Sequence, residues 1–181
     1  MLKENVMIYQ TYEESKKAYK QYIEEHKSNV ILAWNEVQVK CVNQPFVTDK
    51  YINWYISSLI KEHDKSKFDV VEFEPYRKYF YPTIYDTNKE QIQKDYDEAW
   101  IHHYTKNPHH WEYWCNYDQD KERNSLQFIR QAYHVEMMCD WMAMSKFNNN
   151  AVPDWYNDNQ DKIVMCDEDK QFIEMLMNIL F

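Results

Sequence analysis

The stretch NSLQFIRQAYHVEMMCDWMAMSKF, at residues 124–147, is the strongest indication of the fold class in this chain. Its apolar residues recur at the three- and four-residue spacing of one helix face, through Leu126, Ile129, Tyr133, Met137 and Met144. The asparagines at 148–150 follow, and Asn tolerates the left-handed backbone that ends many helices. We therefore expect a long amphipathic helix over about residues 124–147.

Similar periodicity predicts further helices on both sides of this stretch. We expect them at about residues 12–39, 89–104 and 168–180, with another that starts at a Thr48 cap and ends near residues 61–64. Asn107-Pro108 and Asp154 each resemble a helix start. Between these helices, FDVVEFEPYRKYFYP forms a short segment that stops at Pro82.

The composition supports an all-helical chain. It contains no glycine, whereas tight hairpins, P-loops and Rossmann fingerprints need glycine. Its 181 residues are 44% apolar, with 16 Tyr and 7 Trp, which is enough to form a core. The expected fold class is all-α, a single-domain helical bundle over residues 1–181. Its site-bearing core would span about residues 12–147, and its C-terminal helices about 154–181.

Charge and cysteine content limit the partners. The net charge of −9 argues against a nucleic-acid duplex and is typical of a solvated surface. The four cysteines are scattered without a CxxC pair, which favours reduced thiols in a cytoplasmic protein. The N-terminus lacks an apolar signal segment, and no run of about 18 apolar residues predicts a membrane span. A homo-oligomer is compatible with the sequence.

Ionisable residues occupy core-facing positions on four of the predicted helices. His26, His63 and His103 each lie on the same helix face as a series of apolar residues. Glu136 and Asp140 lie one turn apart on the helix of residues 124–147. Burial of unpaired carboxylates is costly, so these groups should pair with or coordinate something. The alternative is that each histidine is an ordinary hydrogen-bonded core residue and that the acids pair with lysines.

The histidines extend this cluster. There are seven, and His109-His110 follows directly after Asn107-Pro108. Imidazole with carboxylate suits Mn, Fe, Co, Ni or Zn, and the absence of cysteine among these candidate ligands favours a catalytic over a structural site. We favour His103 over its neighbour His102 because it continues the line of Ile92, Tyr96 and Ala99. His109-His110 is alternatively a surface pair in a loop.

The order His26, His63-Asp64, Asp140 resembles the H…HD…D pattern of the HD superfamily of metal-dependent phosphohydrolases. That resemblance implies an all-helical HD-domain-like fold and one or two divalent ions, with the second held by histidines between the HD pair and the last Asp. The implied metal ligands are His26, His63, Asp64, His103, His109, His110 and Asp140.

A second resemblance covers most of the chain, from about residue 20 to 165. The strings HDKSKF, EPYRKYFYP, HHYTKNPHHWEYW and EMMCDWMAMS are similar to a small family of uncharacterised bacterial and phage proteins with no assigned activity. This likeness implies a shared fold and site and supplies no substrate.

The leading hypothesis is metal-assisted hydrolysis of a nucleotide or another small phosphorylated compound. Asp64 or Glu136 would act as the catalytic acid or base. The phosphate would be held by residues just beyond the HD pair, namely Lys65, Ser66, Lys67 and Arg77, unless that stretch is only a solvated loop. Many HD nucleotidases carry an acid where this chain has Lys65-Ser66-Lys67. Two alternatives stay open: a di-iron HD-type oxygenase, and a non-catalytic phage or accessory protein that binds a nucleotide or a partner.

Overall fold

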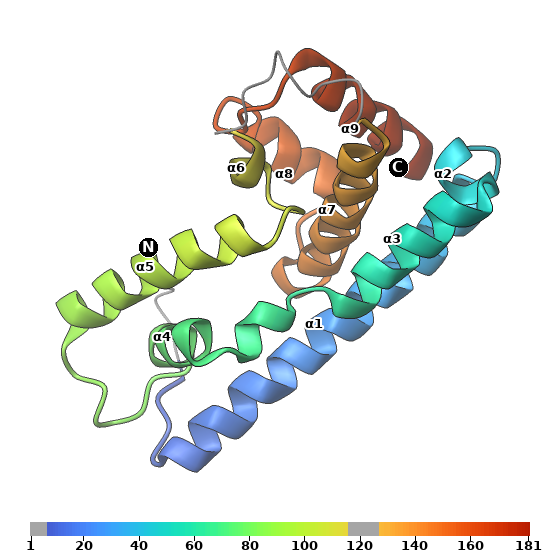
Figure 1. Ribbon diagram of the computed structural model, residues 1–181. Coiled ribbons are helices and arrows are strands. Elements are labelled where there is room, and N and C mark those ends of the chain that lie inside the picture. Colours follow the sequence, from blue (N-terminus) through green and yellow to red (C-terminus); the bar gives the residue numbers. More distant parts are fainter. Residues whose placement is uncertain (1–6, 116–126) are drawn as a thin grey trace. The chain divides into compact units, whose positions relative to one another are not determined.

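The computed structural model describes residues 7–115 and 127–181 (Figure 1). Within these ranges all regular structure is helical and no strand occurs, which confirms the all-α prediction. The helices are α1 (Tyr12–Lys40), α2 (Pro45–Thr48), α3 (Lys50–Glu62), the 3-10 helix η1 (Lys65–Phe68), α4 (Val70–Phe80), α5 (Lys89–Lys106), α6 (Trp111–Trp114), α7 (Gln127–Asn148), α8 (Val152–Asn159) and α9 (Asp167–Leu180).

The chain divides into two compact units. Unit 1 comprises the residues up to Glu25 together with Asp64–Asn107, and unit 2 comprises His26–His63 together with Pro108–Phe181. The helix α1 therefore contributes its first part to unit 1 and its second part to unit 2. A single domain over residues 1–181 stays a prediction, and each unit is described here by itself.

Unit 1 is formed by α4, which packs on α5 and η1, together with the start of α1. Its core is aromatic, and Tyr79 stacks on Tyr96 with ring centroids 4.0 Å apart. The buried members of this core are Tyr19, Ile23, Phe73, Tyr76 and Ala99. Burial of several aromatic rings supplies much of the stabilisation of a unit this small.

The helix α4 differs from the short segment that the sequence predicted. Pro75 lies inside it and removes one intrahelical hydrogen bond, which is why the stretch does not resemble a helix. Phe73, Tyr76 and Tyr79 are nevertheless all buried on the core side of α4. Their burial outweighs the local cost of the proline.

Unit 2 is organised around α7, on which α3, α8 and α9 pack (Figure 1). The second part of α1 lies beside α3, where Trp34 Nε1 donates a 3.0 Å hydrogen bond to Ser57 Oγ. Alanine, valine and methionine dominate the buried face of α7, through Ala132, Val135, Met138, Cys139 and Ala143. The face of α7 that this core fixes also carries the polar residues of the candidate site.

Two helix ends differ from the predicted ones because other residues act as caps. Asp49, rather than Thr48, caps α3, since its Oδ1 accepts from the backbone N–H groups of Tyr51 and Ile52. Asn107 closes α5 instead of opening α6. The prediction that Asn ends α7 without glycine is confirmed, because Asn149 adopts φ 49°.

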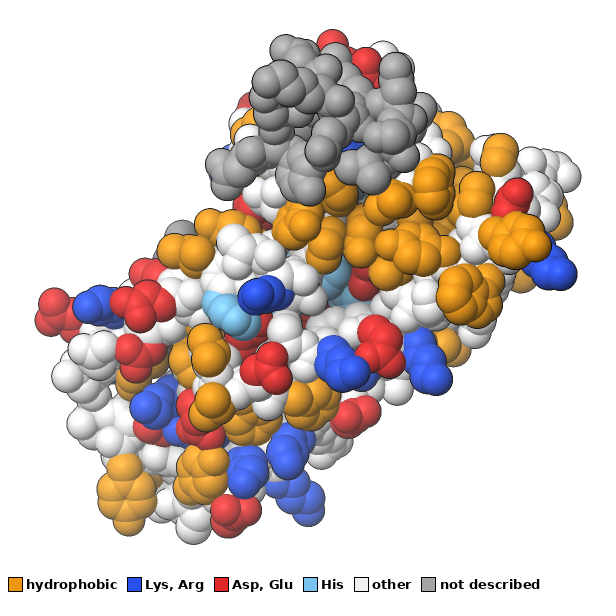
Figure 2. All heavy atoms as spheres, in the orientation of Figure 1, with side chains coloured by type: hydrophobic (Ala, Val, Ile, Leu, Met, Phe, Trp, Pro, Cys, Tyr) orange, Lys and Arg blue, Asp and Glu red, His pale blue; other side chains and the backbone are white. Residues whose placement is uncertain are grey.

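Figure 2 shows acidic and basic side chains interspersed over part of the drawn face, and hydrophobic side chains gathered on another part of it. None of the helices in the described ranges is long and apolar enough to cross a membrane. Cys41, Cys115, Cys139 and Cys166 carry no disulfide.

Candidate metal centre

Two histidines of unit 2 are buried because helical periodicity places them on apolar faces. His26 lies on α1 between Ile23 and Val30, and His63 forms the C-cap of α3. Each is 1% exposed. Both were predicted to face the core, and their burial confirms that part of the prediction.

These two imidazoles meet the carboxylate of Asp140 on α7. His26 Nε2 lies 3.1 Å from Asp140 Oδ1 and 3.3 Å from His63 Nε2. His63 Nε2 lies 3.7 Å from the same Asp140 oxygen. Three potential ligand atoms, from α1, from the C-cap of α3 and from α7, thus form a nearly equilateral triangle.

The size of this triangle fits a small divalent cation. Ligands at about 2.0–2.1 Å from a tetrahedral metal are separated from one another by about 3.4 Å. The three sides of 3.1, 3.3 and 3.7 Å lie around that value. Two imidazoles with one carboxylate also form the donor set preferred by Zn, Fe, Co, Ni and Mn.

A second acid of α7, Glu136, contacts the Nδ1 atoms of two histidines. Its Oε1 lies 2.9 Å from His63 Nδ1 and 3.3 Å from His109 Nδ1. An ionised carboxylate only accepts hydrogen bonds, so each Nδ1 carries a proton, and in the neutral form of each ring Nε2 then has a free lone pair. Carboxylates fix metal-binding histidines in this way in many metal sites.

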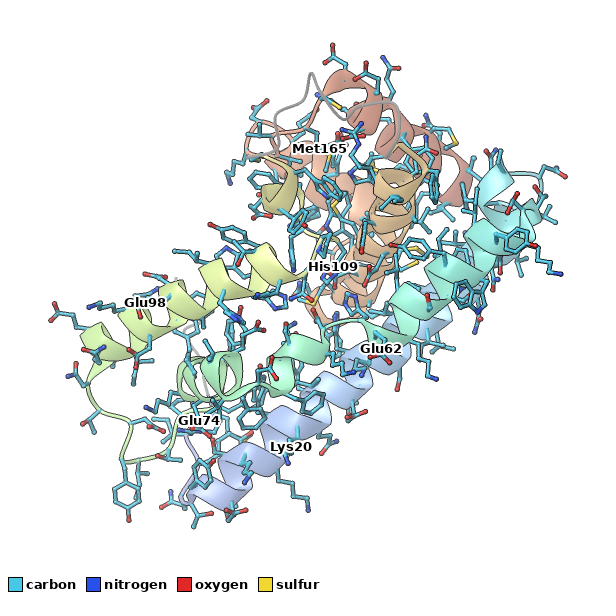
Figure 3. The ribbon with its side chains drawn as sticks, in the orientation of Figure 1. Lys20, Glu62, Glu74, Glu98, His109 and Met165 are labelled. Atoms are coloured by element: carbon cyan, nitrogen blue, oxygen red, sulfur yellow. The ribbon has the colours of Figure 1, made fainter. Side chains whose placement is uncertain are left out.

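His109 brings another ring to this cluster, from the stretch that precedes α6 (Figure 3). Its ring centroid lies 4.3 Å from that of His63 and 4.4 Å from that of His110. Ligand atoms of His63, His109 and Asp140 all lie within 4.8 Å of one another. His109 is 2% exposed, so the surface-loop alternative is wrong for this residue, whereas His110 is only half-buried.

Both acids of the cluster are held in the ionised form. Burial alone would raise the pKa of Asp140, but hydrogen bonds and charge from His26 and His63 outweigh it and hold that pKa well below its usual value. Burial likewise opposes ionisation of Glu136, yet His109 and His63 lower its pKa to about 2. The two buried carboxylates are therefore stabilised as anions by the imidazoles around them.

Asp64 and His103, predicted for the same centre, belong to unit 1. There Asp64 Oδ1 lies 3.3 Å from His103 Nε2, and both side chains are buried. Asp64 adopts the left-handed conformation with φ 55° and also pairs with Lys67 at 2.5 Å. The choice of His103 over His102 agrees with burial, because the side chain of His102 is 29% exposed.

The sequence reasoning missed Glu72, which organises unit 1. Its two carboxylate oxygens each lie 2.8 Å from an Nδ1 atom, one of His102 and one of His103. Burial would raise the pKa of Glu72, but hydrogen bonds from His103 and His102 outweigh it and lower the pKa. Glu72 lies one turn before Tyr76, and both are buried on α4. The sequence analysis predicted no helix here, so it did not place Glu72 on a buried face.

The predicted phosphate-binding residues have different surroundings, all within unit 1. Lys65 is exposed. Ser66 Oγ donates to Glu72 and accepts from Asn107 Nδ2, at 3.0 and 2.7 Å. Lys67 is part-exposed beside Asp64.

Arg77, the fourth predicted phosphate ligand, is buried and makes contacts within unit 1. It is 2% exposed, and its Nη1 donates to Ser15 Oγ at 2.8 Å and to Asp86 Oδ2 at 3.1 Å. Its Nε donates to Glu74 at 3.1 Å. These contacts tie α4 to the start of α1 and to the turn before α5.

His134, which the sequence did not assign to the centre, lies in a separate buried network of unit 2. Its Nδ1 is 3.8 Å from Asp169 Oδ1 of α9, which also pairs with Arg130 at 3.1 Å. Burial lowers the pKa of His134 to about 4. It is therefore a suitable control position for the centre.

A model of a protein family described as a family of unknown function (DUF5662) matches residues 15–180 of the chain. Searches of the curated proteins and of the solved structures find no match.

Proposed function

Because this chain belongs to the DUF5662 family, whose function is unknown, we propose a function from the geometry of its histidine–carboxylate cluster. Unit 2 binds a divalent metal ion and uses it to hydrolyse a phosphate ester. The observation that carries this proposal is the triangle of His26 Nε2, His63 Nε2 and Asp140 Oδ1, with sides of 3.1 to 3.7 Å.

The residues divide into ligands and a positioning group. His26, His63 and Asp140 coordinate the ion, and His109 adds a further imidazole nitrogen. Glu136 fixes the tautomer of His63 and of His109 through their Nδ1 atoms. Because its Oε1 is occupied by these contacts and its side chain is buried, Glu136 takes this positioning role in the proposal, rather than the acid–base role considered from the sequence. Asp64 as ligand or base stays a prediction.

A bound divalent ion would supply Lewis-acid chemistry and lower the pKa of a bound water toward neutrality. The chain's own contribution is a rigid, ionised ligand set. Three of its members lie on or at the end of different helices, each fixed by packing against an apolar core. With the three ligands of the triangle, a tetrahedral ion would keep its fourth position for water or substrate, as catalytic sites require, and with His109 as a fourth ligand the ion would need five or six positions.

The choice of hydrolysis over other metal chemistry is supported by the likeness to the HD superfamily. The three atoms of the triangle come from the first His, from the His of the HD pair, and from the last Asp of that ordered pattern. An HD-domain-like fold, a cytoplasmic location and a small phosphorylated substrate form part of the same proposal.

Elemental analysis of protein purified without a histidine tag is the direct test. We expect about one equivalent of a transition metal per chain or more, and its loss in His26→Ala and in Asp140→Ala. His134→Ala is the matched control, since it removes a buried histidine of α7 outside the triangle. Equal metal content in all three variants would refute the centre.

The reaction is tested on a panel of phosphomonoesters and nucleotides with Mn²⁺ or Co²⁺. Release of phosphate by the wild type and not by Asp140→Ala supports hydrolysis. Two irons per chain with near-ultraviolet absorption and no phosphate release would instead indicate a di-iron oxygenase. Metal retention without turnover would indicate a binding protein.

A further inference from the structure

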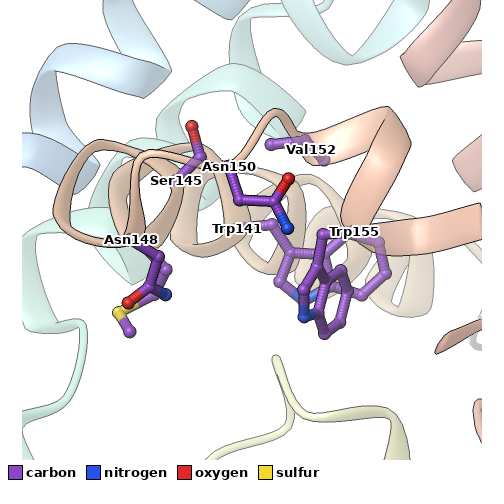
Figure 4. Close-up of a pocket in the computed structure, with 7 residues that line it drawn as sticks. Trp141, Ser145, Asn148, Asn150, Val152 and Trp155 are labelled. Atoms are coloured by element: carbon purple, nitrogen blue, oxygen red, sulfur yellow. The ribbon is translucent and has the colours of Figure 1, made fainter. Parts of the chain in front are cut away.

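A second feature of unit 2 is a pocket where α7 ends and α8 begins (Figure 4). It encloses about 160 Å³. Its lining residues come from the last two turns of α7, the asparagine-rich connection and the first turn of α8: Trp141, Met144, Ser145, Asn148, Asn150, Val152 and Trp155. A cavity of about 150 Å³ accepts a benzene molecule, so this pocket is the size of one aromatic ring system.

Aromatic rings form one wall of the pocket. The indoles of Trp141 and Trp155 lie with centroids 5.0 Å apart at 56°, and Trp141 also contacts Tyr156 at 5.9 Å. Tyr156 and Val152 are buried, which holds this wall against the core. The pocket is therefore lined by indole surface that the core holds in place.

Hydrogen-bonding groups form the rest of the lining. Ser145, Asn148 and Asn150 contribute one hydroxyl and two carboxamides, and Figure 4 shows the amide of Asn150 next to the indoles. A carboxamide both donates and accepts, as the edge of a nucleobase does. No lining residue carries a formal charge, so the part of a ligand that fits here is uncharged.

The pocket lies further along α7 than Asp140, mostly on a neighbouring face of the helix. Trp141 directly follows Asp140, and Met144 is one turn further on the same side as Asp140. At a rise of 1.5 Å per residue, the pocket begins within about 6 Å of Asp140 along the helix axis. The axial offset is therefore short enough for a ligand with a phosphate at the ion and a ring in the pocket, joined by a spacer such as a ribose.

From these observations we propose that the Trp141–Trp155 pocket binds the base of a nucleoside or nucleotide. Placement of the phosphate at Asp140 rests on the proposed metal site, whereas binding of the base does not. The base stacks on the indole wall, and Asn148 and Asn150 bond to its polar edge. This would make nucleotides, rather than sugar phosphates, the substrate class of the centre.

The test separates the two parts with nucleosides, which carry no phosphate. Adenosine, guanosine, cytidine and uridine are titrated into the full chain in EDTA, with calorimetry as the readout. We expect at least one to bind with Kd of about 1 mM or tighter. Absence of binding by all four would overturn the proposal, even if the metal analysis succeeds.

Variants locate the binding. Stacking on an aromatic side chain contributes enough that Trp155→Leu should weaken binding about tenfold, and Trp155→Phe should retain most of it. Trp54→Leu is the matched control, because Trp54 is 69% exposed on α3. Asn150→Ala, an exposed position, should weaken binding several-fold while the melting temperature stays unchanged. Equal affinity of Trp155→Leu and Trp54→Leu would overturn the assignment of the pocket.

A comparison of adenosine monophosphate with ribose 5-phosphate, each with Mn²⁺ present, then tests the link to the centre. Tighter binding of the nucleotide than of either adenosine or the sugar phosphate supports one continuous ligand. If Mn²⁺ does not bind but nucleosides do, the proposed function fails and the pocket stands.

Discussion

His63 Nδ1 lies 2.9 Å from Glu136 Oε1, while the Nε2 atom of the same ring faces Asp140 at 3.7 Å. The ring of His63 therefore contacts Glu136 through one nitrogen and faces Asp140, one turn later on α7, with the other. The contact with Glu136 favours the tautomer of His63 that has its proton on Nδ1 and Nε2 as the ligand atom. Loss of this contact should therefore lower the affinity for a metal ion.

Glu136→Gln should weaken metal binding by about 10- to 100-fold, because a carboxamide is a poorer acceptor than a carboxylate and no longer favours Nε2 as the ligand atom. Competition with a chelating dye measures the affinity. Glu36→Gln is the control, since the ion pair that Glu36 forms within the described residues is the exposed one with Lys40 on α1. Affinities that agree within twofold for the two variants would show that Glu136 does not position the ligands.

Removal of the ion should destabilise the chain. A ligand that binds only the folded state at 100 times its Kd adds about 2.7 kcal/mol. For a chain of this size that corresponds to about 5–10 °C in melting temperature. Differential scanning calorimetry with EDTA and with Zn²⁺ or Mn²⁺ checks this, and Asp140→Ala should show no metal-dependent shift.

Arg77→Met should destabilise unit 1 by about 3–5 kcal/mol, because it leaves Asp86 without its buried partner. Chemical denaturation gives the free energy of unfolding. Lys94→Met, on α5 of the same unit, is the control and should cost less than about 1 kcal/mol, because the side chain of Lys94 is 68% exposed. A stable Arg77→Met protein with a raised KM for phosphate esters would restore the phosphate-binding role.

Most of the helical framework could be predicted from periodicity, since α1, α3, α5, α7 and α9 each repeat apolar residues over several turns. Some helix ends differ from the predicted ones because other residues cap them. Asp49 caps the start of α3 in place of Thr48, and Asn107 caps the end of α5 instead of the start of α6. The helix α4 was missed because Pro75 hides a face that only tertiary packing makes helical.

The candidate site shows the same division. His26, His63, Glu136 and Asp140 were found because each lies among apolar residues of a strongly periodic helix. Glu72 was missed with its helix, and a sequence does not show that one acid can serve two histidines. Arg77 was predicted to bind phosphate because it is a basic residue that follows the HD pair. The sequence does not show that it contacts Asp86, Glu74 and Ser15 in the folded chain.

Tyr76→Phe should leave the free energy of unfolding unchanged or raise it by up to about 1 kcal/mol. Within the described part of the chain the buried Tyr76 hydroxyl has no hydrogen-bond partner, and burial raises its pKa above the usual value. Tyr55→Phe is the control, because it removes the 3.3 Å bond to Tyr133 and should lower stability. A clear loss of stability in Tyr76→Phe would show that its hydroxyl is satisfied in solution.

His134 should make the chain sensitive to mild acid. Its folded pKa of about 4 lies below the ordinary 6.5, since burial and Arg130 oppose the charge more than Asp169 favours it. Between these two pH values the unfolded chain binds more protons, so stability falls as the pH decreases from about 6.5 to about 4. His134→Gln should flatten this part of the melting-temperature profile, and a slope equal to that of the wild type would contradict the assignment.

The three atoms of the triangle come from residues 26, 63 and 140, which are far apart along the chain. An ion held by them would close two long loops at once and would act as a reversible cross-link, much as a disulfide does in secreted proteins. The supply of metal in its surroundings would then govern how long this protein survives against proteases, in addition to any reaction that it catalyses.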